Sequence, residues 1–140
     1  MKELMLLLLV WIGNNSTLEV EQVFLPEVKF VSSAELHARF GLEERCDGIK
    51  VKGLYHKDDK IIYLHNDWDQ YNIVDRSFLL HELVHHRQIE SNYKCRQEKE
   101  KEAYELQFKY LIENAINNPQ EVLHINDLFY IILTTCAAIE

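Results

Sequence analysis

The chain of 140 residues is long enough for one domain with a single core and too short for two domains of ordinary size. Hydrophobic residues make up 47% and charged residues 27%, and only 4 Gly and 2 Pro are present, which argues against long disordered segments. The formal net charge of -8 disfavours a phosphate backbone as partner, because clustered Lys and Arg drive that kind of binding. We therefore expect a folded domain that does not bind nucleic acid.

The N-terminus carries an apolar run from Leu4 to Ile12, followed by polar residues 13–17. The run is too short to span a bilayer, so we expect no integral membrane span. Its length fits the apolar core of a signal peptide, although Glu3 offsets the positive charge before it and no small-residue cleavage site follows. Residues 1–17 are therefore either the signal peptide of an exported protein, periplasmic or secreted, or an apolar segment that stays packed on a cytoplasmic protein. Residues 18–140 form a single domain under both interpretations.

One short strand and one helix are expected next along the chain. The strand is expected near Val23–Leu25, where Pro26 ends it. Ser32 or Ser33 is expected to cap a helix from Ala34 to Phe40.

Two segments of strand-like composition follow, from Ile49 to Tyr55 and from Lys60 to His65, with polar residues 56–59 between them. Tyr, Ile and Val on either side of a polar turn predict a β-hairpin. A sheet edge beside a metal-binding helix would also let a peptide bind as an additional strand. The hairpin therefore has a functional interpretation besides that of covering the helix.

The segment from Ser77 to Gln88 contains the pattern His-Glu-x-x-His on a predicted helix. Positions four apart lie above one another on a helix, so His81 and His85 present two imidazoles to a single ion. In zinc peptidases the Glu between them, here Glu82, acts on water as a general base.

Apolar residues surround this helix, so most of its sides should be buried. Asp75 or Ser77 is expected to cap it. Burying two imidazoles and a carboxylate is costly unless each finds a partner, and a shared divalent ion with its water would provide partners for all three. The sequence therefore predicts a metal site.

Two histidines need a third protein ligand, with the fourth position left open for water. A second helix, predicted from Arg96 to Asn114, offers the candidates. At about 100° per residue, Glu100 lies about 50° from the centre of the apolar stripe of this helix, Glu102 lies about 110° away and Glu98 points outward. We favour Glu100 as the ligand, with Glu102 as the alternative.

The motif His81–His85, followed by Glu100-Lys101-Glu102-Ala103-Tyr104, resembles the gluzincin branch of the zincin-like metallopeptidases. In that family the Glu of an E-x-x-A/S-D/N motif is the third ligand, and the resemblance places it on Glu100. Tyr104 stands where the family has Asp or Asn, which hydrogen-bonds to a ligating histidine, so that support has to come from elsewhere. More specifically, residues 51–111 are similar to a group of small, mostly uncharacterised, exported bacterial metallopeptidases.

Other side chains near the motif are candidates for supporting roles. Gln88 is expected to contact the substrate or a residue that supports the ligands, and His86 faces away from the metal. Tyr104 is either a tyrosine of the core or of the rim of the site, which is the interpretation we favour, or a donor to a tetrahedral oxyanion. Of the 3 Cys, we expect Cys46 and Cys95 to form a disulfide in an oxidising compartment, and Cys95 as a thiolate ligand is the alternative.

These expectations define an α+β domain with a minimal zincin-like fold. It has an N-terminal helix, a small antiparallel sheet that includes the hairpin, the helix with the His-Glu-x-x-His motif, and two further C-terminal helices, the last within residues 127–139. The expected activity is hydrolysis of a peptide or protein substrate by a metalloendopeptidase with one Zn²⁺ per chain. The alternative is a non-catalytic domain that the metal stabilises or that binds other proteins. Glu82 favours the enzyme, because a purely structural site gains nothing from a base.

Overall fold

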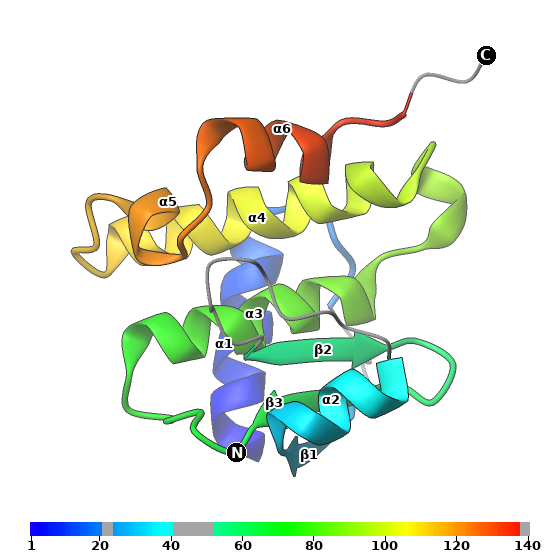
Figure 1. Cartoon of the computed structure of the whole chain (residues 1–140), viewed down its shortest axis with the longest axis vertical. Coiled ribbons are helices and arrows are strands. Elements are labelled where there is room, and N and C mark those ends of the chain that lie inside the picture. The colour runs from blue at the N-terminus through cyan, green and yellow to red at the C-terminus, as the bar shows by residue number, and fades with distance from the viewer. Residues whose placement is uncertain (21–23, 41–51, 138–140) are drawn as a thin grey trace.

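A computed structural model describes residues 1–20, 24–40 and 52–137 of the chain (Figure 1). Its elements, in chain order, are α1 (Lys2–Asn15), β1 (Glu27–Val31), α2 (Ser33–Phe40), β2 (Gly53–His56), β3 (Ile61–His65), α3 (Ile73–Arg87), the 3₁₀ turn η1 (Glu90–Asn92), α4 (Arg96–Glu113), α5 (Pro119–Val122) and α6 (Asp127–Thr134). The predicted α+β class is confirmed.

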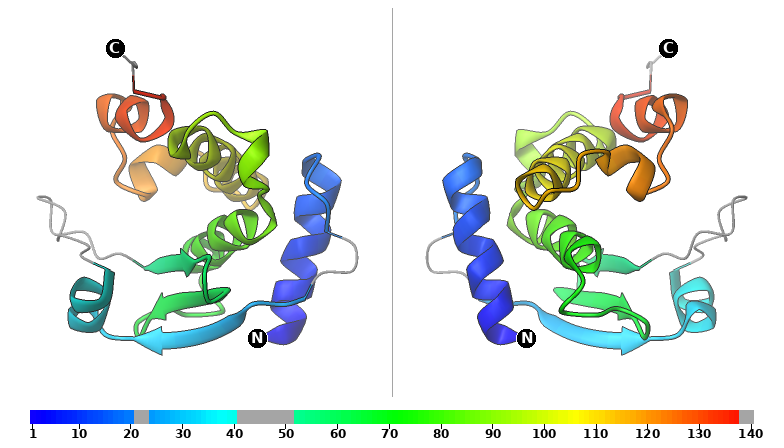
Figure 2. Two further views of the ribbon diagram at one scale, coloured as in Figure 1. Left: turned by 90° about the vertical axis from the view of Figure 1, so that its right-hand side faces the viewer. Right: turned by 90° about the vertical axis from the view of Figure 1, so that its left-hand side faces the viewer.

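The elements form layers, with the sheet at one end, α3 on the sheet, α4 on α3, and α6 on the far side of α4 (Figure 2). α1 packs against α3 from the side. α3 is therefore surrounded, and four of its apolar side chains are fully buried: Leu79, Leu80, Leu83 and Val84. His81 and Glu82 of its polar stripe are buried with them, and His85 is half-buried.

The three-stranded sheet has the order β1-β3-β2 and is mixed. β2 and β3 pair antiparallel, which confirms the hairpin, although residues 49–51 lie outside the described part. β1 runs parallel to β3, so the expectation of a purely antiparallel sheet is wrong. The chain passes through α2 before it returns through the hairpin, and such a crossover is what allows two strands to run in the same direction.

The first strand lies after the proline, not before it. β1 begins at Glu27, directly behind Pro26, whereas the expected strand ended there; Val23 lies outside the described residues. A proline has no N–H for the ladder and is tolerated before the first residue of a strand. Ser32 caps α2 as expected, because its hydroxyl accepts a hydrogen bond of 3.1 Å from the backbone N–H of Glu35.

α3 begins earlier than expected. Its cap is Asn72, whose side-chain oxygen accepts hydrogen bonds from the N–H groups of Val74 at 2.9 Å and Asp75 at 3.1 Å. Asp75 lies inside the first turn, where its carboxylate accepts from the N–H of Asp69 at 2.8 Å. Asp75 and Ser77 are therefore not caps, since both serve tertiary contacts from within the helix.

The apolar N-terminal run forms α1, which buries Met5, Leu8, Leu9 and Ile12 in the core. Near its end, Trp11 donates a hydrogen bond of 2.8 Å to Glu113 on α4. Packing on the domain is one of the two arrangements that the sequence left open for this segment. Within the described residues, no helix has the length and apolar character needed to cross a membrane.

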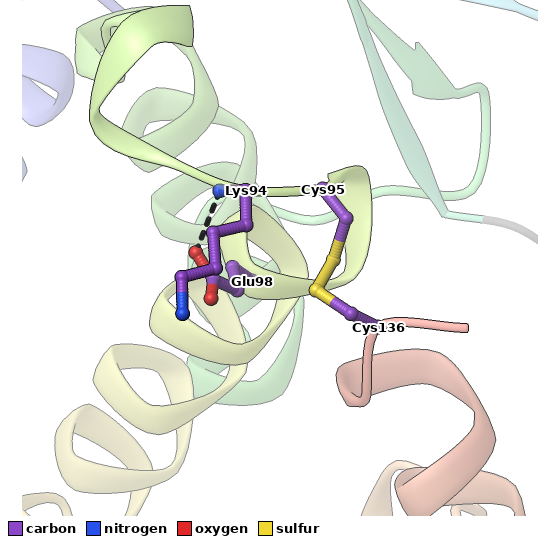
Figure 3. Close-up of a disulfide and its surroundings, with 4 residues drawn as sticks. All are labelled: Lys94, Cys95, Glu98 and Cys136. Carbon is purple, nitrogen blue, oxygen red and sulfur yellow. Dashed lines mark hydrogen bonds between the residues drawn. A yellow bond between two sulfur atoms is a disulfide. The ribbon is translucent and has the colours of Figure 1, made fainter. Parts of the chain in front are cut away.

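A disulfide joins Cys95, the N-cap of α4, to Cys136, just after α6 (Figure 3). The expected Cys46–Cys95 pair is therefore wrong, and Cys46 lies outside the described residues. α6 runs back along α4 toward its first turn, which brings the residue after α6 to the start of α4 (Figure 1). A bonded sulfur is not a thiolate, so Cys95 is also excluded as a metal ligand.

α6 is shorter than the apolar segment predicted for residues 127–139. It packs on α4 through Phe129 and Tyr130, while Leu128, Ile131 and Ile132 are exposed. It therefore closes the core with one face only.

We expect Cys136→Ser to lower the free energy of unfolding by about 4 kcal/mol, because cross-linking residues 41 apart removes chain entropy from the unfolded state. Urea denaturation of the oxidised proteins measures this difference. Cys46→Ser is the matched control and should keep both the disulfide and the wild-type midpoint. Equal midpoints for wild type and Cys136→Ser would contradict the prediction.

Candidate metal centre

The two histidines of α3 and one carboxylate of α4 meet at a single point. His81 Nε2 and His85 Nε2 are 3.2 Å apart, as expected for positions four apart on one helix face. Glu100 places one carboxylate oxygen 3.1 Å from His81 Nε2 and the other 2.8 Å from His85 Nε2. The structure therefore brings Glu100, not Glu102, to the histidines, and the three residues form a group that could hold a metal ion.

The distances in this group fit one tetrahedral ion. A Zn–N bond of about 2.0–2.1 Å places two tetrahedral ligand atoms about 3.3 Å apart. The 3.2 Å between the two imidazole nitrogens lies close to that value. Each nitrogen also lies within 3.1 Å of one of the two Glu100 oxygens, and one ligand atom from each of the three residues can be chosen so that all lie within 4.8 Å of one another. The donor atoms, two imidazole nitrogens and a carboxylate, are also those that zinc prefers.

The ring of His81 is held from behind by Gln107 on α4. The amide oxygen of Gln107 lies 2.8 Å from His81 Nδ1, and its NH₂ group donates to Ser77 Oγ at 3.1 Å. Ser77 Oγ accepts this bond because its own hydrogen goes to the carbonyl of Val74 at 2.6 Å. The amide must therefore turn its oxygen to the ring, which makes Nδ1 the donor and directs the Nε2 lone pair of a neutral ring at the centre.

Gln88 holds the ring of His85 in the same way. Its amide oxygen lies 2.7 Å from His85 Nδ1, and its NH₂ group donates to the carbonyl of Lys99 at 2.9 Å and to Glu102 at 3.0 Å. Both partners of the NH₂ group are acceptors, so the orientation of the amide is again determined. Tyr93 donates its hydroxyl to the same oxygen of Glu102. Glu102 therefore supports the centre through Gln88 and does not enter it.

The charges of the centre depend on one another. Burial lowers the pKa of His85, but the hydrogen bond and charge of Glu100 outweigh it and raise the value to about 9. Burial raises the pKa of Glu100, but the two histidines hold it well below its usual range. The cluster therefore requires a positive charge between its atoms, which either a proton on His85 or a metal ion provides.

Glu82 lies beside the centre with 7% of its surface exposed. Burial is the main reason that its pKa is raised above the ordinary value, and the backbone N–H of Tyr55 on β2 counters this with a hydrogen bond to the carboxylate. A Cβ atom at Gly53 would lie 3.4 Å from Glu82 Cγ and 3.3 Å from Leu64 Cδ2. Glycine at this position therefore lets β2 approach the base closely.

A cleft of about 810 Å³ opens on the centre between β2, α3 and α4. Glu82, His85, Gln88 and Glu100 are among the residues that line it. Among the described strands β2 pairs only with β3, so it forms one edge of the sheet. Tyr55 of β2 lines the cleft, and its hydroxyl oxygen lies 2.9 Å from His86 Nδ1. His86 therefore has a hydrogen-bonding role away from the metal ligands, as expected.

Tyr104 does not line the cleft. Its ring packs edge-on against His81, with the ring centres 4.6 Å apart, and it also packs edge-on against Tyr130 of α6 at 6.1 Å. The side chain helps to fix the position of His81, and this placement does not favour the oxyanion role that the sequence suggested for it.

A second polar group, Ser33, His65 and Asp67, has the composition of a serine hydrolase triad. Ser33 Oγ lies 2.7 Å from His65 Nε2, and His65 Nδ1 accepts a hydrogen bond of 2.9 Å from the backbone N–H of Asp67. Nδ1 therefore carries the lone pair and Nε2–H donates to the serine. A base for the serine needs the opposite tautomer, so this group serves structure rather than nucleophilic catalysis.

Gln107 is the site residue that sequence reasoning missed. It lies on the apolar stripe of its helix and is fully buried as that stripe requires. A long amide at an apolar position, seven residues after a candidate ligand and so on the same helix face, was the available signal.

Fold and site together define a small α+β domain with a centre of two histidines and one glutamate. The chain belongs to the family described as a domain of unknown function, DUF6647, whose profile matches residues 1–138. No curated protein and no solved structure matches it at a significant level. The matched region includes α1 as well as every residue of the centre.

We expect Gln107→Leu to weaken divalent-ion binding about 10- to 100-fold, which is the usual effect of losing a residue that orients a ligand. Leucine fills similar space but accepts no hydrogen bond from His81. Titration with Co²⁺, followed by its visible absorption, measures the change. Gln97→Leu, on the same helix and outside the centre, is the control; equal affinities for the two variants would contradict the role of Gln107.

Proposed function

We propose that the protein is a zinc-dependent peptidase, with zinc held by His81, His85 and Glu100 and with Glu82 as general base. The observation that carries the proposal is the combination of three converging ligand atoms with a buried carboxylate at the same cleft. A site that served only stability would not need an uncoordinated carboxylate beside an open cleft. The motif resemblance to gluzincins supports the same reaction.

A bound zinc ion would supply a Lewis acid for the scissile carbonyl and lower the pKa of a water molecule. Glu82 accepts the proton of the attacking water at its carboxylate and returns it to the leaving amine. Burial raises the pKa of Glu82 above the ordinary value of a carboxyl group, which favours uptake of the proton from water before it passes to the amine. Gln88 and Gln107 keep both imidazoles fixed through the cycle.

The edge of β2 with which no described strand pairs supports a peptide as the substrate. Leu54, Tyr55 and His56 of this strand line the cleft, and the backbone N–H of Tyr55 reaches Glu82. An extended peptide that pairs with such an edge is held by main-chain hydrogen bonds, with its backbone near the base and the metal ligands.

We also propose that the protein works in an oxidising compartment, as the Cys95–Cys136 disulfide favours. A signal in residues 1–17, as the sequence allows, would either stay attached to the exported protein or be removed from it. The burial of α1 favours the attached form, since removal would uncover the side of α3 on which it packs. The mass of the protein recovered from its own cells distinguishes the two forms.

We expect one zinc per chain in the wild type and its loss in Glu100→Ala, because two histidines alone leave the site without its third ligand. Glu102→Ala should retain zinc with an affinity reduced about 10- to 100-fold, since Glu102 acts through Gln88. Elemental analysis and competition titration with a chromophoric chelator give both values. If Glu102→Ala loses more zinc than Glu100→Ala, the ligand assignment is wrong.

Glu82→Gln should abolish peptide hydrolysis and leave zinc binding nearly intact, because Glu82 acts on water and does not ligate. Cleavage of an unstructured protein such as casein, followed by mass spectrometry, measures the activity. Wild type that binds zinc but shows no cleavage would favour the alternative of a non-catalytic, metal-stabilised domain. A loss of zinc in Glu82→Gln would show that the residue has another role.

A further inference from the structure

The walls of the cleft carry a different charge from the chain as a whole. Apart from Glu82 and the metal centre, four basic and two acidic side chains line it, which gives 4 − 2 = +2, whereas the whole chain has a net charge of -8. These six residues are Lys57, Lys60, Arg96, Lys99, Asp58 and Glu90. A cleft with an excess of one charge raises the local concentration of ligands of the opposite charge.

Two of the lysines are already occupied by one acid. Lys57 Nζ lies 2.9 Å from Glu90 Oε1, and Lys99 forms an ion pair with the same oxygen. Hydrogen bonds from Lys99 and Lys57 lower the pKa of Glu90 to about 2, so it stays charged. Glu90 is thus shared between the two lysines.

Arg96 is the basic residue of the cleft best placed to bind a ligand. It lies one helical turn before Glu100 on α4, on the same side of the helix, and lines the same cleft. Its side chain is exposed, and it has no hydrogen bond or ion pair with any of the described residues. A guanidinium offers a planar fork of donors that matches a carboxylate through two parallel hydrogen bonds.

The distance from Arg96 to the centre sets the position of such a carboxylate on a peptide. Four residues of helix rise about 6 Å, and an extended peptide advances about 3.3 Å per residue. When the scissile peptide bond lies at Glu100 and the histidines, Arg96 therefore lies beside a peptide residue about two positions away from that bond.

We propose that the cleft selects peptides with an Asp or Glu about two residues from the scissile bond, and that Arg96 is the residue that determines this specificity. The inference rests on the proposed peptidase function, since the scissile bond is placed by the metal centre. The group that Arg96 would bind is a carboxylate, which a peptide presents either on a side chain or at its C-terminus. The side chain is the source we assign, because three residues of β2 line the cleft and the edge of β2 that pairs with no described strand can pair with a peptide that extends past the site.

The test uses a series of C-terminally amidated peptides that share one sequence and differ only in the position of a single Glu. Two matched series carry Gln or Lys in place of that Glu. One peptide of the Gln series is also made with a free C-terminal carboxylate. Binding to the zinc-loaded Glu82→Gln protein is measured by fluorescence anisotropy, and cleavage by the zinc-loaded wild type is measured by mass spectrometry. Binding requires no turnover, so the two measurements separate the specificity from the reaction.

We expect the best Glu peptide to bind about 3- to 10-fold more tightly than its Gln match, the range for an ion pair that water partly screens. Arg96→Gln should remove this preference, Arg96→Lys should keep part of it, and high ionic strength should weaken it. Lys101→Gln is the matched control, because Lys101 is an exposed cation of α4 that does not line the cleft.

The outcomes separate the two proposals. An Arg96-dependent preference for Glu without cleavage supports the specificity and contradicts the peptidase. Cleavage with equal binding of the Glu and Gln series overturns the specificity and leaves the peptidase intact. Preference for the free C-terminus alone overturns the assignment to a side chain, and no binding of any peptide overturns both proposals.

Discussion

Two imidazole nitrogens and a carboxylate converge between α3 and α4, and the rest of the fold keeps this costly arrangement in place. Lone pairs and negative charge that face one another at about 3 Å repel, so the group is stable only with a positive charge at its centre and with rigid surroundings. The rigidity comes from burial of α3 against the sheet, α1 and α4. The disulfide and α6 restrain α4 from the other side, which fixes the helix that carries Glu100.

One helix, α4, provides most of what the centre needs. Glu100 and Gln107 are seven residues apart and face the same direction, so the ligand and the amide that orients His81 share one surface. Ala103 lies between them and is fully buried, and its small side chain lets α4 come close to α3. Glu102 points away from this surface, yet it reaches Gln88 beyond the end of α3 and so supports His85 from the far side.

The sequence predicted the features that depend on local periodicity. The pairing of His81 with His85, the hairpin, and the inward position of Glu100 all follow from regular spacing along helices and strands. Features that depend on contacts between distant segments were missed. The disulfide partner of Cys95 depends on where α6 returns, and the partner of Gln107 depends on how α3 and α4 are rotated against each other.

The use of amides rather than carboxylates behind the histidines also balances the charge of the centre. A divalent ion contributes +2, Glu100 contributes -1 and a charged Glu82 contributes -1, while Gln88 and Gln107 contribute nothing. The buried group is then neutral, which minimises the cost of withdrawing it from water. Carboxylates in place of the two amides would leave a net charge of -2 in the same space and would favour protonation of Glu82, the group that has to accept a proton. The neutral partners orient the ligands without raising the pKa of the base further, so the departure from the gluzincin pattern at Tyr104 is compatible with the proposed chemistry.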